Sequence, residues 1–231
     1  MPSALQISCI TKHYYPETLD NFKKLCSILN INCTETSEAT CCGLPYFDRG
    51  ELKAAKTIAE YNLQVFGQNA LVCNSSKCLN CYQIQYPKIF NNTVSHNNAT
   101  HLAKNSSGIN NLLQQISQDT LSTITGHYFL VKECCRTEWI GEFSKKMENC
   151  TWTFPNLVNT CCGAGASMAS ENTETSRQMG KILIAEFEKS DAIAMVFEDD
   201  ICRKQIDIVA NASGIPVKTM NIIDLLMQNQ N

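Results

Sequence analysis

The chain has 231 residues, of which 44% are hydrophobic and 18% are charged, and its formal net charge is −3. This is the composition of a globular protein, and the slightly acidic balance argues against nucleic acid or an anionic membrane as a partner. The sequence contains neither a signal-peptide pattern nor an apolar run close to the roughly 20 residues of a membrane span, so we expect a cytoplasmic protein. Its fourteen cysteines are then expected to be reduced thiols.

In the first half of the chain, short apolar strands alternate with helices. Strands are predicted at residues 4–10, 31–34 and 70–73, and helices at residues 16–29 and 51–66. Asn74-Ser75-Ser76 is a plausible cap for a further helix that begins near Lys77. Residues 86–107 are polar and rich in asparagine, which predicts a loop, and a helix is expected at residues 109–116.

The second half repeats this order. Strands are predicted at residues 128–132, 151–154, 192–197 and 216–220, with a helix at 173–188 and a short helix that ends near Leu226. Alternation of strands and helices is typical of a parallel sheet. We therefore predict an α/β fold of two pseudo-repeated Rossmann-like parallel-sheet halves, divided into domains 1–118 and 119–231.

The repeat is clearest in the cysteines. Cys41-Cys42-Gly43 recurs 120 positions later as Cys161-Cys162-Gly163. Each copy has one cysteine upstream and another downstream, and the first copy ends in a Cys-x-x-Cys pair. The first set is Cys9, Cys41, Cys42, Cys78 and Cys81, and the second is Cys135, Cys161, Cys162 and Cys202.

The predicted fold brings each set together. Cys9, Cys78, Cys135 and Cys202 follow predicted strands directly or within a few residues, and in parallel sheets ligands gather beyond the carboxyl ends of the strands. Glycine after each cysteine pair allows a tight turn with positive φ. The loops that carry the cysteines are therefore expected at the carboxyl ends of the strands.

Converging thiolates select iron–sulfur clusters, zinc or Cu(I) over hard cations. Five thiols exceed what a zinc site needs, and adjacent cysteines suit a multi-iron centre better than two short zinc knuckles do. The chemistry favours an iron–sulfur cluster. The alternatives are a zinc-stabilised binding module and dithiol–disulfide chemistry at Cys78 and Cys81.

These residues carry a family resemblance. The segments concerned are Cys9-Ile10 with Tyr15-Pro16-Glu17, Thr40 to Pro45, Cys73 to Cys78, Cys161 to Gly165, Asp200 to Cys202, and Pro216 to Met220. In them the chain resembles the cysteine-rich CCG-domain proteins, and among these the lactate-utilisation protein A group of iron–sulfur oxidoreductases. The resemblance implies a cytoplasmic electron-transfer subunit that works with two companion proteins in oxidising L-lactate to pyruvate, with little activity on lactate alone.

More distantly, the chain is similar to the B subunit of heterodisulfide reductase, whose paired motifs bind noncubane [4Fe-4S] clusters. The first cysteine set matches that five-cysteine pattern, which implies one cluster. The second set departs from it, because Gln205 stands where the last cysteine would be. Four thiols remain as candidate ligands of a second cluster. A heterodisulfide-reductase-type subunit and a glycolate oxidase iron–sulfur subunit are the alternatives within the family.

Several cysteines fall outside the repeated frame. Cys134 lies beside Cys135, but alternation along a strand would direct the two side chains to opposite faces, which favours Cys135 as the ligand. Cys73 is expected to pack as a small buried hydrophobe. Cys26, Cys33 and Cys150 are expected to be core or surface thiols.

Overall fold

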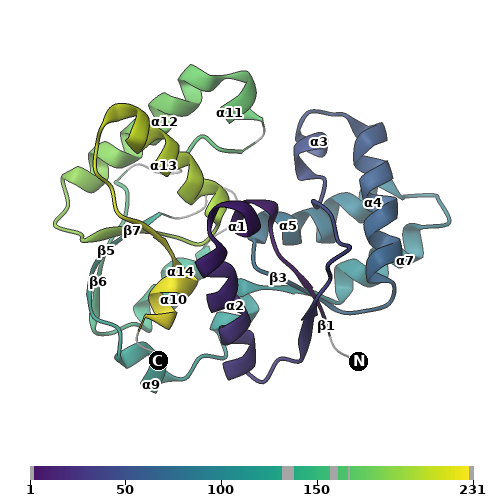
Figure 1. Ribbon diagram of the computed structural model, residues 1–231, viewed down its shortest axis with the longest axis horizontal. Helices are drawn as coiled ribbons and strands as arrows, with labels where there is room; N and C mark the ends of the chain where they lie inside the picture. The colour runs from purple at the N-terminus through teal and green to yellow at the C-terminus, as the bar shows by residue number, and fades with distance from the viewer. Residues whose placement is uncertain (1–2, 132–137, 157–160, 166, 229–231) are drawn as a thin grey trace.

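The computed structural model describes residues 3–131, 138–156, 161–165 and 167–228, and its two halves have the same architecture (Figure 1). Each half holds a four-stranded, all-parallel sheet, ordered β2-β1-β3-β4 in the first half and β6-β5-β7-β8 in the second. The strands are β1 (Ser3–Gln6), β2 (Cys33–Glu35), β3 (Leu71–Cys73), β4 (Ser106–Gly108), β5 (Gly126–Val131), β6 (Cys150–Thr153), β7 (Ala194–Phe197) and β8 (Thr219–Asn221). The predicted α/β fold with two parallel-sheet halves is confirmed.

Helices connect the strands in a matching order. In the first half they are α1 (Cys9–Tyr14), α2 (Pro16–Ile28), α3 (Leu44–Asp48), α4 (Leu52–Phe66), α5 (Ser76–Asn80), a π-helical turn η1 (Cys81–Gln85), α6 (Tyr86–Ile89), α7 (His96–Lys104) and α8 (Ile109–Leu113). The remaining helices are α9 (Gln118–Ser122), α10 (Glu138–Lys145), α11 (Met168–Glu171), α12 (Thr173–Glu188), α13 (Asp200–Ser213) and α14 (Ile222–Met227).

Two local predictions are wrong. Residues 86–107 are not a loop, because α6 and α7 occupy most of the segment. The buried side chains of Ala99 and Leu102 provide α7 with an apolar face despite its two asparagines. The first strand ends at Gln6 rather than continuing to Cys9, because the Ser8 hydroxyl accepts a hydrogen bond from Thr11 N and begins helix α1 there.

The apolar core lies on both faces of each sheet. One continuous cluster fills the space between the halves, and it includes Leu5 and Val72 of the first sheet with Leu130 and Val196 of the second. The other face of each sheet carries a separate cluster, and cysteines belong to both of these, as Cys78 does in the first half. Side chains that alternate along a strand supply the two faces. The sheet faces turned away from the shared core therefore carry the buried cysteines of the two sets, which are Cys42, Cys78, Cys81, Cys162 and Cys202.

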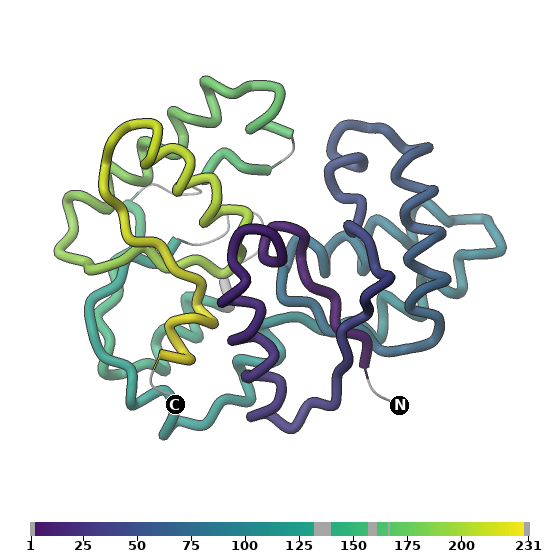
Figure 2. The backbone as a smooth tube through the Cα atoms, in the orientation of Figure 1, coloured from purple at the N-terminus to yellow at the C-terminus, as the bar shows by residue number. Residues whose placement is uncertain are grey.

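The halves meet along α1 and α2 on one side and α13 and α14 on the other, as the purple and yellow segments in the middle of Figure 2 show. Polar contacts join them as well. The Thr11 hydroxyl donates to Asp200 at 2.7 Å, and the Tyr15 hydroxyl donates to Asp207 at 2.5 Å. The division into domains at residue 118 stays a prediction.

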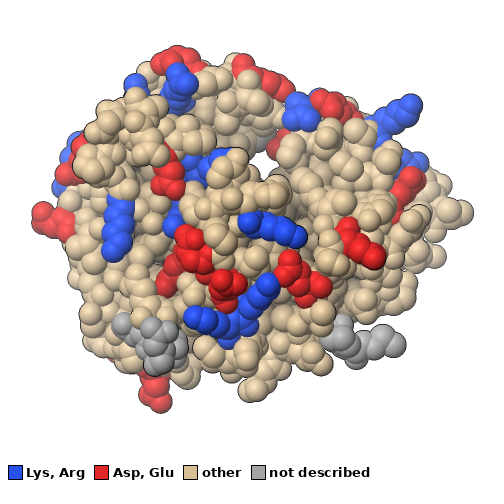
Figure 3. Space-filling view, viewed as in Figure 1, with Lys and Arg blue, Asp and Glu red and all other residues tan. Residues whose placement is uncertain are grey.

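Acidic and basic side chains are interspersed on the face drawn in Figure 3 rather than gathered in a patch of one sign. Within the described ranges, the helices are too short or too polar to cross a membrane.

Candidate functional site

The first cysteine set is brought together by three loops. Cys9 is the first residue of α1, directly after its cap Ser8. Asn74 joins this loop to the one that carries Cys78, because its side-chain oxygen accepts from Ser8 N at 2.7 Å and its amide donates to the Thr11 hydroxyl at 2.7 Å. Both Ser8 and Asn74 are buried, so these bonds are shielded from water. The positions of two distant cysteines are thus fixed relative to each other.

The Cys41-Cys42-Gly43 turn is held by a buried asparagine on α4. Asn62 accepts from Thr40 N at 3.1 Å and donates to Cys41 O at 3.0 Å. Gly43 has φ of 86°, a left-handed conformation that glycine adopts without steric cost, and its N–H points to Cys41 Sγ at 3.4 Å.

Replacing Asn62 with alanine is expected to destabilise the chain by about 2 to 3 kcal/mol, because it leaves buried backbone groups of the turn without partners. Asn62→Asp should cost at least as much, since it keeps the acceptor for Thr40 N but loses the donors and buries a carboxylate against Cys41 O. Urea unfolding of the wild type and both variants, under reducing conditions, measures the difference. An Asn62→Ala variant as stable as the wild type would contradict the role assigned to this side chain.

The third loop follows β3. Ser75 caps α5 by accepting from Cys78 N at 3.3 Å. Cys78 and Cys81 were both expected in the first turn of this helix, and the expectation is right for Cys78 and wrong for Cys81. Cys81 lies beyond α5, at the first residue of the π-helical turn η1. Pro87, two residues after this turn, lacks an N–H and disfavours a regular α-helical ladder at this point. The Cys81 thiol is fully buried and donates to Cys42 O at 3.2 Å.

The five thiols form a connected series. These are free thiols joined by hydrogen bonds. The Cys9 thiol is hydrogen-bonded to that of Cys41, Cys41 to Cys42, and Cys42 to both Cys78 and Cys81. Hydrogen bonds from Cys42 and Cys9 lower the pKa of Cys41 to about 3. The hydrogen bond to Cys42, followed by burial, raises the pKa of Cys78.

A cavity of about 250 Å³ lies against these thiols, between the two halves. Four of the five thiols line it: Cys9, Cys41, Cys42 and Cys78. Across the cavity lies the loop of the second half that includes Gly165. Figure 3 shows the surface hollowed between the halves, beside α3 and α11 of Figure 1. Four thiols of the predicted first set are thus gathered along one side of a cavity, and the fifth, that of Cys81, lies behind them against Cys42 O.

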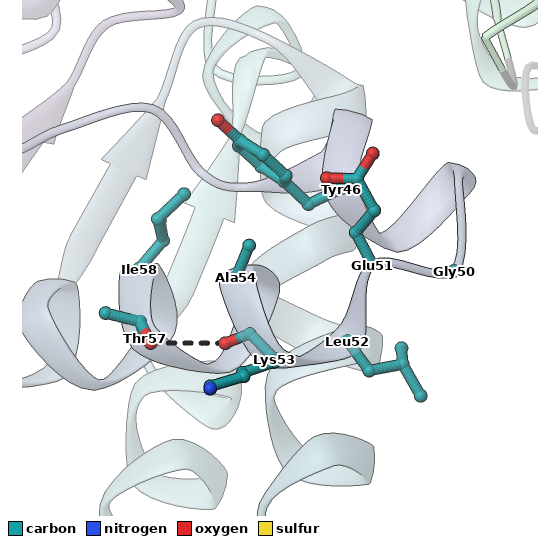
Figure 4. A pocket seen from close by; sticks show the side chains of 8 residues that line it. All are labelled: Tyr46, Gly50, Glu51, Leu52, Lys53, Ala54, Thr57 and Ile58. Atoms are coloured by element: carbon teal, nitrogen blue, oxygen red, sulfur yellow. Dashed lines mark hydrogen bonds between the residues drawn. The ribbon is translucent and has the colours of Figure 1, made fainter.

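A larger, more open hollow of about 790 Å³ lies on the outer side of α3 and α4 (Figure 4). Its wall is formed by Tyr46, Gly50, Glu51, Leu52, Lys53, Ala54, Thr57 and Ile58. This wall holds no thiol, so the chemistry predicted from the cysteines belongs to the smaller cavity.

In the second half, the Cys162 thiol is hydrogen-bonded to the thiols of Cys161 and Cys202. Gly163 has φ of 83°, and its N–H points to Cys161 Sγ at 3.4 Å, the same arrangement as in the first copy. Cys202 is the third residue of α13, as Cys78 is of α5. Cys135 lies outside the described residues, as do Cys134 and Arg136. Three of the four predicted thiols are therefore together.

Gln205 stands in place of the final cysteine, and its side-chain amide stabilises the Cys161-Cys162-Gly163 turn through Ser176. Its side chain donates to the Ser176 hydroxyl at 2.7 Å, and that hydroxyl donates to Gly163 O at 2.9 Å. Hydrogen bonds from Asn62 and Tyr86 fix the Cys41-Cys42-Gly43 turn. Those of Gln205 and Ser176 fix the Cys161-Cys162-Gly163 turn. No motif spacing marks these polar residues, so reasoning from the sequence missed all of them except Gln205.

Across the residues that the structure describes, no group of three or more His, Cys, Asp or Glu side chains converges on one ion. The first set instead extends along a cavity wall. Thiols are the ligands that iron–sulfur clusters take, and a spread of sulfurs suits a centre of several atoms better than one ion. The donor set therefore fits the predicted kind of group.

Comparison with known proteins agrees with the motif. The family model described as "Cysteine-rich domain" (CCG) matches residues 3–83 and 145–207, which is more than half of the chain and includes the first set and most of the second.

Among curated relatives, lactate utilization protein A of Exiguobacterium sp. is 26% identical over 98% of this chain and 97% of its own length. The proteins of the same name from Halalkalibacterium halodurans and Geobacillus kaustophilus are 22% and 23% identical, each over 98% of this chain and over 96% and 98% of their own lengths. The similarity thus extends over almost the whole chain, and the family match confirms the resemblance: the chain belongs to the cysteine-rich CCG-domain family.

Proposed function

We propose that this chain is an iron–sulfur electron-transfer protein whose first cysteine set holds one [4Fe-4S] cluster. The observation that carries the proposal is the connected series of thiols from three distant loops along one cavity. When bound, the cluster supplies one-electron chemistry, and Cys9, Cys41, Cys42, Cys78 and Cys81 are its ligands. The surrounding residues hold the ligands in place.

The pathway is proposed from the relatives. Lactate utilization protein A aligns with this chain from end to end, so we infer a role in oxidising L-lactate, together with two companion subunits, in the cytoplasm. The described residues offer thiols rather than a site for a hydride-accepting cofactor, which assigns oxidation of the organic substrate to the companions. Heterodisulfide-reductase-type and glycolate oxidase iron–sulfur subunits remain the alternatives.

The second set is proposed as a further, incomplete site. It has lost the equivalent of Cys81 to Gln205, whose amide is committed to Ser176. Cys135, Cys161, Cys162 and Cys202 are its candidate ligands. Four thiols are enough for a four-coordinate centre.

Iron and acid-labile sulfide, measured per chain on protein purified without oxygen, test the proposal. About four of each are expected, or about eight if the second set is also occupied. A Cys41→Ser/Cys42→Ser variant should lose about four of each, because these residues are the centre of the connected series.

The control is Cys33→Ser/Cys150→Ser, which likewise removes two thiols, both of them half-buried and neither in either set. It should keep all of its iron. Zinc in place of iron, even after anaerobic reconstitution, would replace the electron-transfer function with the zinc-stabilised binding module.

A further inference from the structure

The Tyr82 hydroxyl is a buried polar group without a hydrogen-bond partner among the described residues. Its side chain is fully buried, directly after Cys81 in the π-helical turn. A buried hydroxyl that forms no hydrogen bond costs about 1 to 3 kcal/mol, and most such groups have a partner. An unmet donor at this place indicates that something absent from the polypeptide accepts its hydrogen bond.

The Tyr82 side chain lies close to part of the first set, because it directly follows Cys81 in the chain. Burial raises the pKa of Tyr82, so its hydroxyl remains a hydrogen-bond donor. The side chain packs in the same apolar cluster as Cys42 and Cys78. The acceptor that the hydroxyl lacks is therefore to be sought at the sulfurs.

Packing keeps the hydroxyl in this place. The Tyr82 ring meets the rings of Phe66 and Tyr86 edge to face, with centroids 5.6 Å and 4.9 Å away. All three side chains are fully buried, so the ring has no room to turn toward water.

Tyr86 provides an internal comparison. Its hydroxyl donates to Cys42 O at 3.1 Å and accepts from Asn62 at 3.1 Å, so its hydrogen bonds are made within the polypeptide. Tyr82, one turn earlier and equally buried, has no such bonds. The two tyrosines therefore differ in whether the protein alone satisfies them.

We propose that the Tyr82 hydroxyl donates a hydrogen bond to a sulfur of the cluster held by Cys42 and Cys78, and that this bond raises the reduction potential of the cluster. The inference rests on the proposed function. An added electron increases the negative charge on the sulfurs, so a donor to them stabilises the reduced form more than the oxidised form. Tyr82 would contact a sulfur of the cluster without being one of the ligands.

The test is Tyr82→Phe, which keeps the ring and removes only the hydroxyl. In a redox titration followed by EPR, the ratio of reduced to oxidised cluster at a fixed potential should fall about tenfold, which is a shift of about 59 mV for a one-electron couple. Iron content should not change. In resonance Raman spectra, the shift of the iron–sulfur bands on exchange into D₂O should decrease in the variant.

In the cluster-free protein, loss of the Tyr82 hydroxyl is expected to do no harm. There Tyr82→Phe should leave the melting temperature unchanged or raise it, because it removes an unmet donor. The matched control Tyr86→Phe should lower it, because Asn62 and Cys42 O each lose a hydrogen-bond partner.

An unchanged potential in a Tyr82→Phe protein with full iron would overturn this inference and leave the proposed function intact. Complete loss of iron from the variant would also overturn it, since one hydrogen bond does not hold a cluster. A wild-type chain without iron would refute the proposed function, and the inference with it, because the acceptor would not exist.

Discussion

Arg203→Met is expected to destabilise the chain by about 3 to 5 kcal/mol, because the substitution leaves buried carboxylates without their counter-charge. The Arg203 guanidinium is bonded to Asp224 at 3.0 Å, lies 3.7 Å from Asp200, and stacks on the ring of Tyr15 at 3.9 Å. The Asp200 side chain is 1% exposed and that of Asp224 12% exposed. Urea unfolding measures the loss.

The neighbouring residue supplies the control. Lys204 contacts the ring of Tyr14, which is 55% exposed, so Lys204→Met should cost about 1 kcal/mol or less. In an Asp224→Asn background, the cost of Arg203→Met should decrease, because one of the carboxylates is already neutral. Equal costs in the two backgrounds would show that the charge contact is not what stabilises the interface.

The second large effect is expected at Gly163. A methyl group there would lie 2.6 Å from Ser176 O, a backbone atom, and φ of 83° disfavours any residue with a Cβ. Gly163→Ala should therefore cost about 3 to 5 kcal/mol, the sum of a left-handed conformation and a clash that no side chain can relieve.

Gly43→Ala is its matched control in the other copy. The conformation is the same, with φ of 86°, but the nearest atom is Ile58 Cγ2 at 3.3 Å, a side-chain atom that can move. Gly43→Ala is therefore expected to destabilise the chain by about 1 to 2 kcal/mol. Urea unfolding of the two variants side by side gives the difference, and equal losses would contradict the clash at Ser176.

Periodicity and spacing were enough to predict the parallel sheets, the repeat and the gathering of the first cysteine set. Their failures have physical causes. In α7, burial of Ala99 and Leu102 outweighs the low helix propensity of two asparagines, and propensity is only a weak prior. The strand β4 (Ser106–Gly108) is too short and too polar to show alternation.

The groups that support the cysteines could not be predicted for a different reason. Tyr82 and Asn62 act through contacts between distant segments, and nothing in their sequence neighbourhood separates them from ordinary helix residues. Arg203 likewise reads as one more charge on the amphipathic helix α13 until its contacts with Tyr15 and Asp224 of other elements are known.

The N-terminal caps of α5 and α13 contact each other across the two halves, and this contact requires the two halves to differ in sequence. Ser75 and Asp199 are the caps of these equivalent helices, and the Ser75 hydroxyl donates to the Asp199 carboxylate at 2.5 Å. In a symmetric pair of identical chains, a residue that meets its own copy has the same chemistry on both sides, so two aspartates there would repel each other. A single chain that contains both copies is free of that constraint, because each copy can change separately. One cap can then be a donor, Ser75, and the other an acceptor, Asp199. The same freedom allows one copy to keep a thiol at Cys81 while the other uses the amide of Gln205.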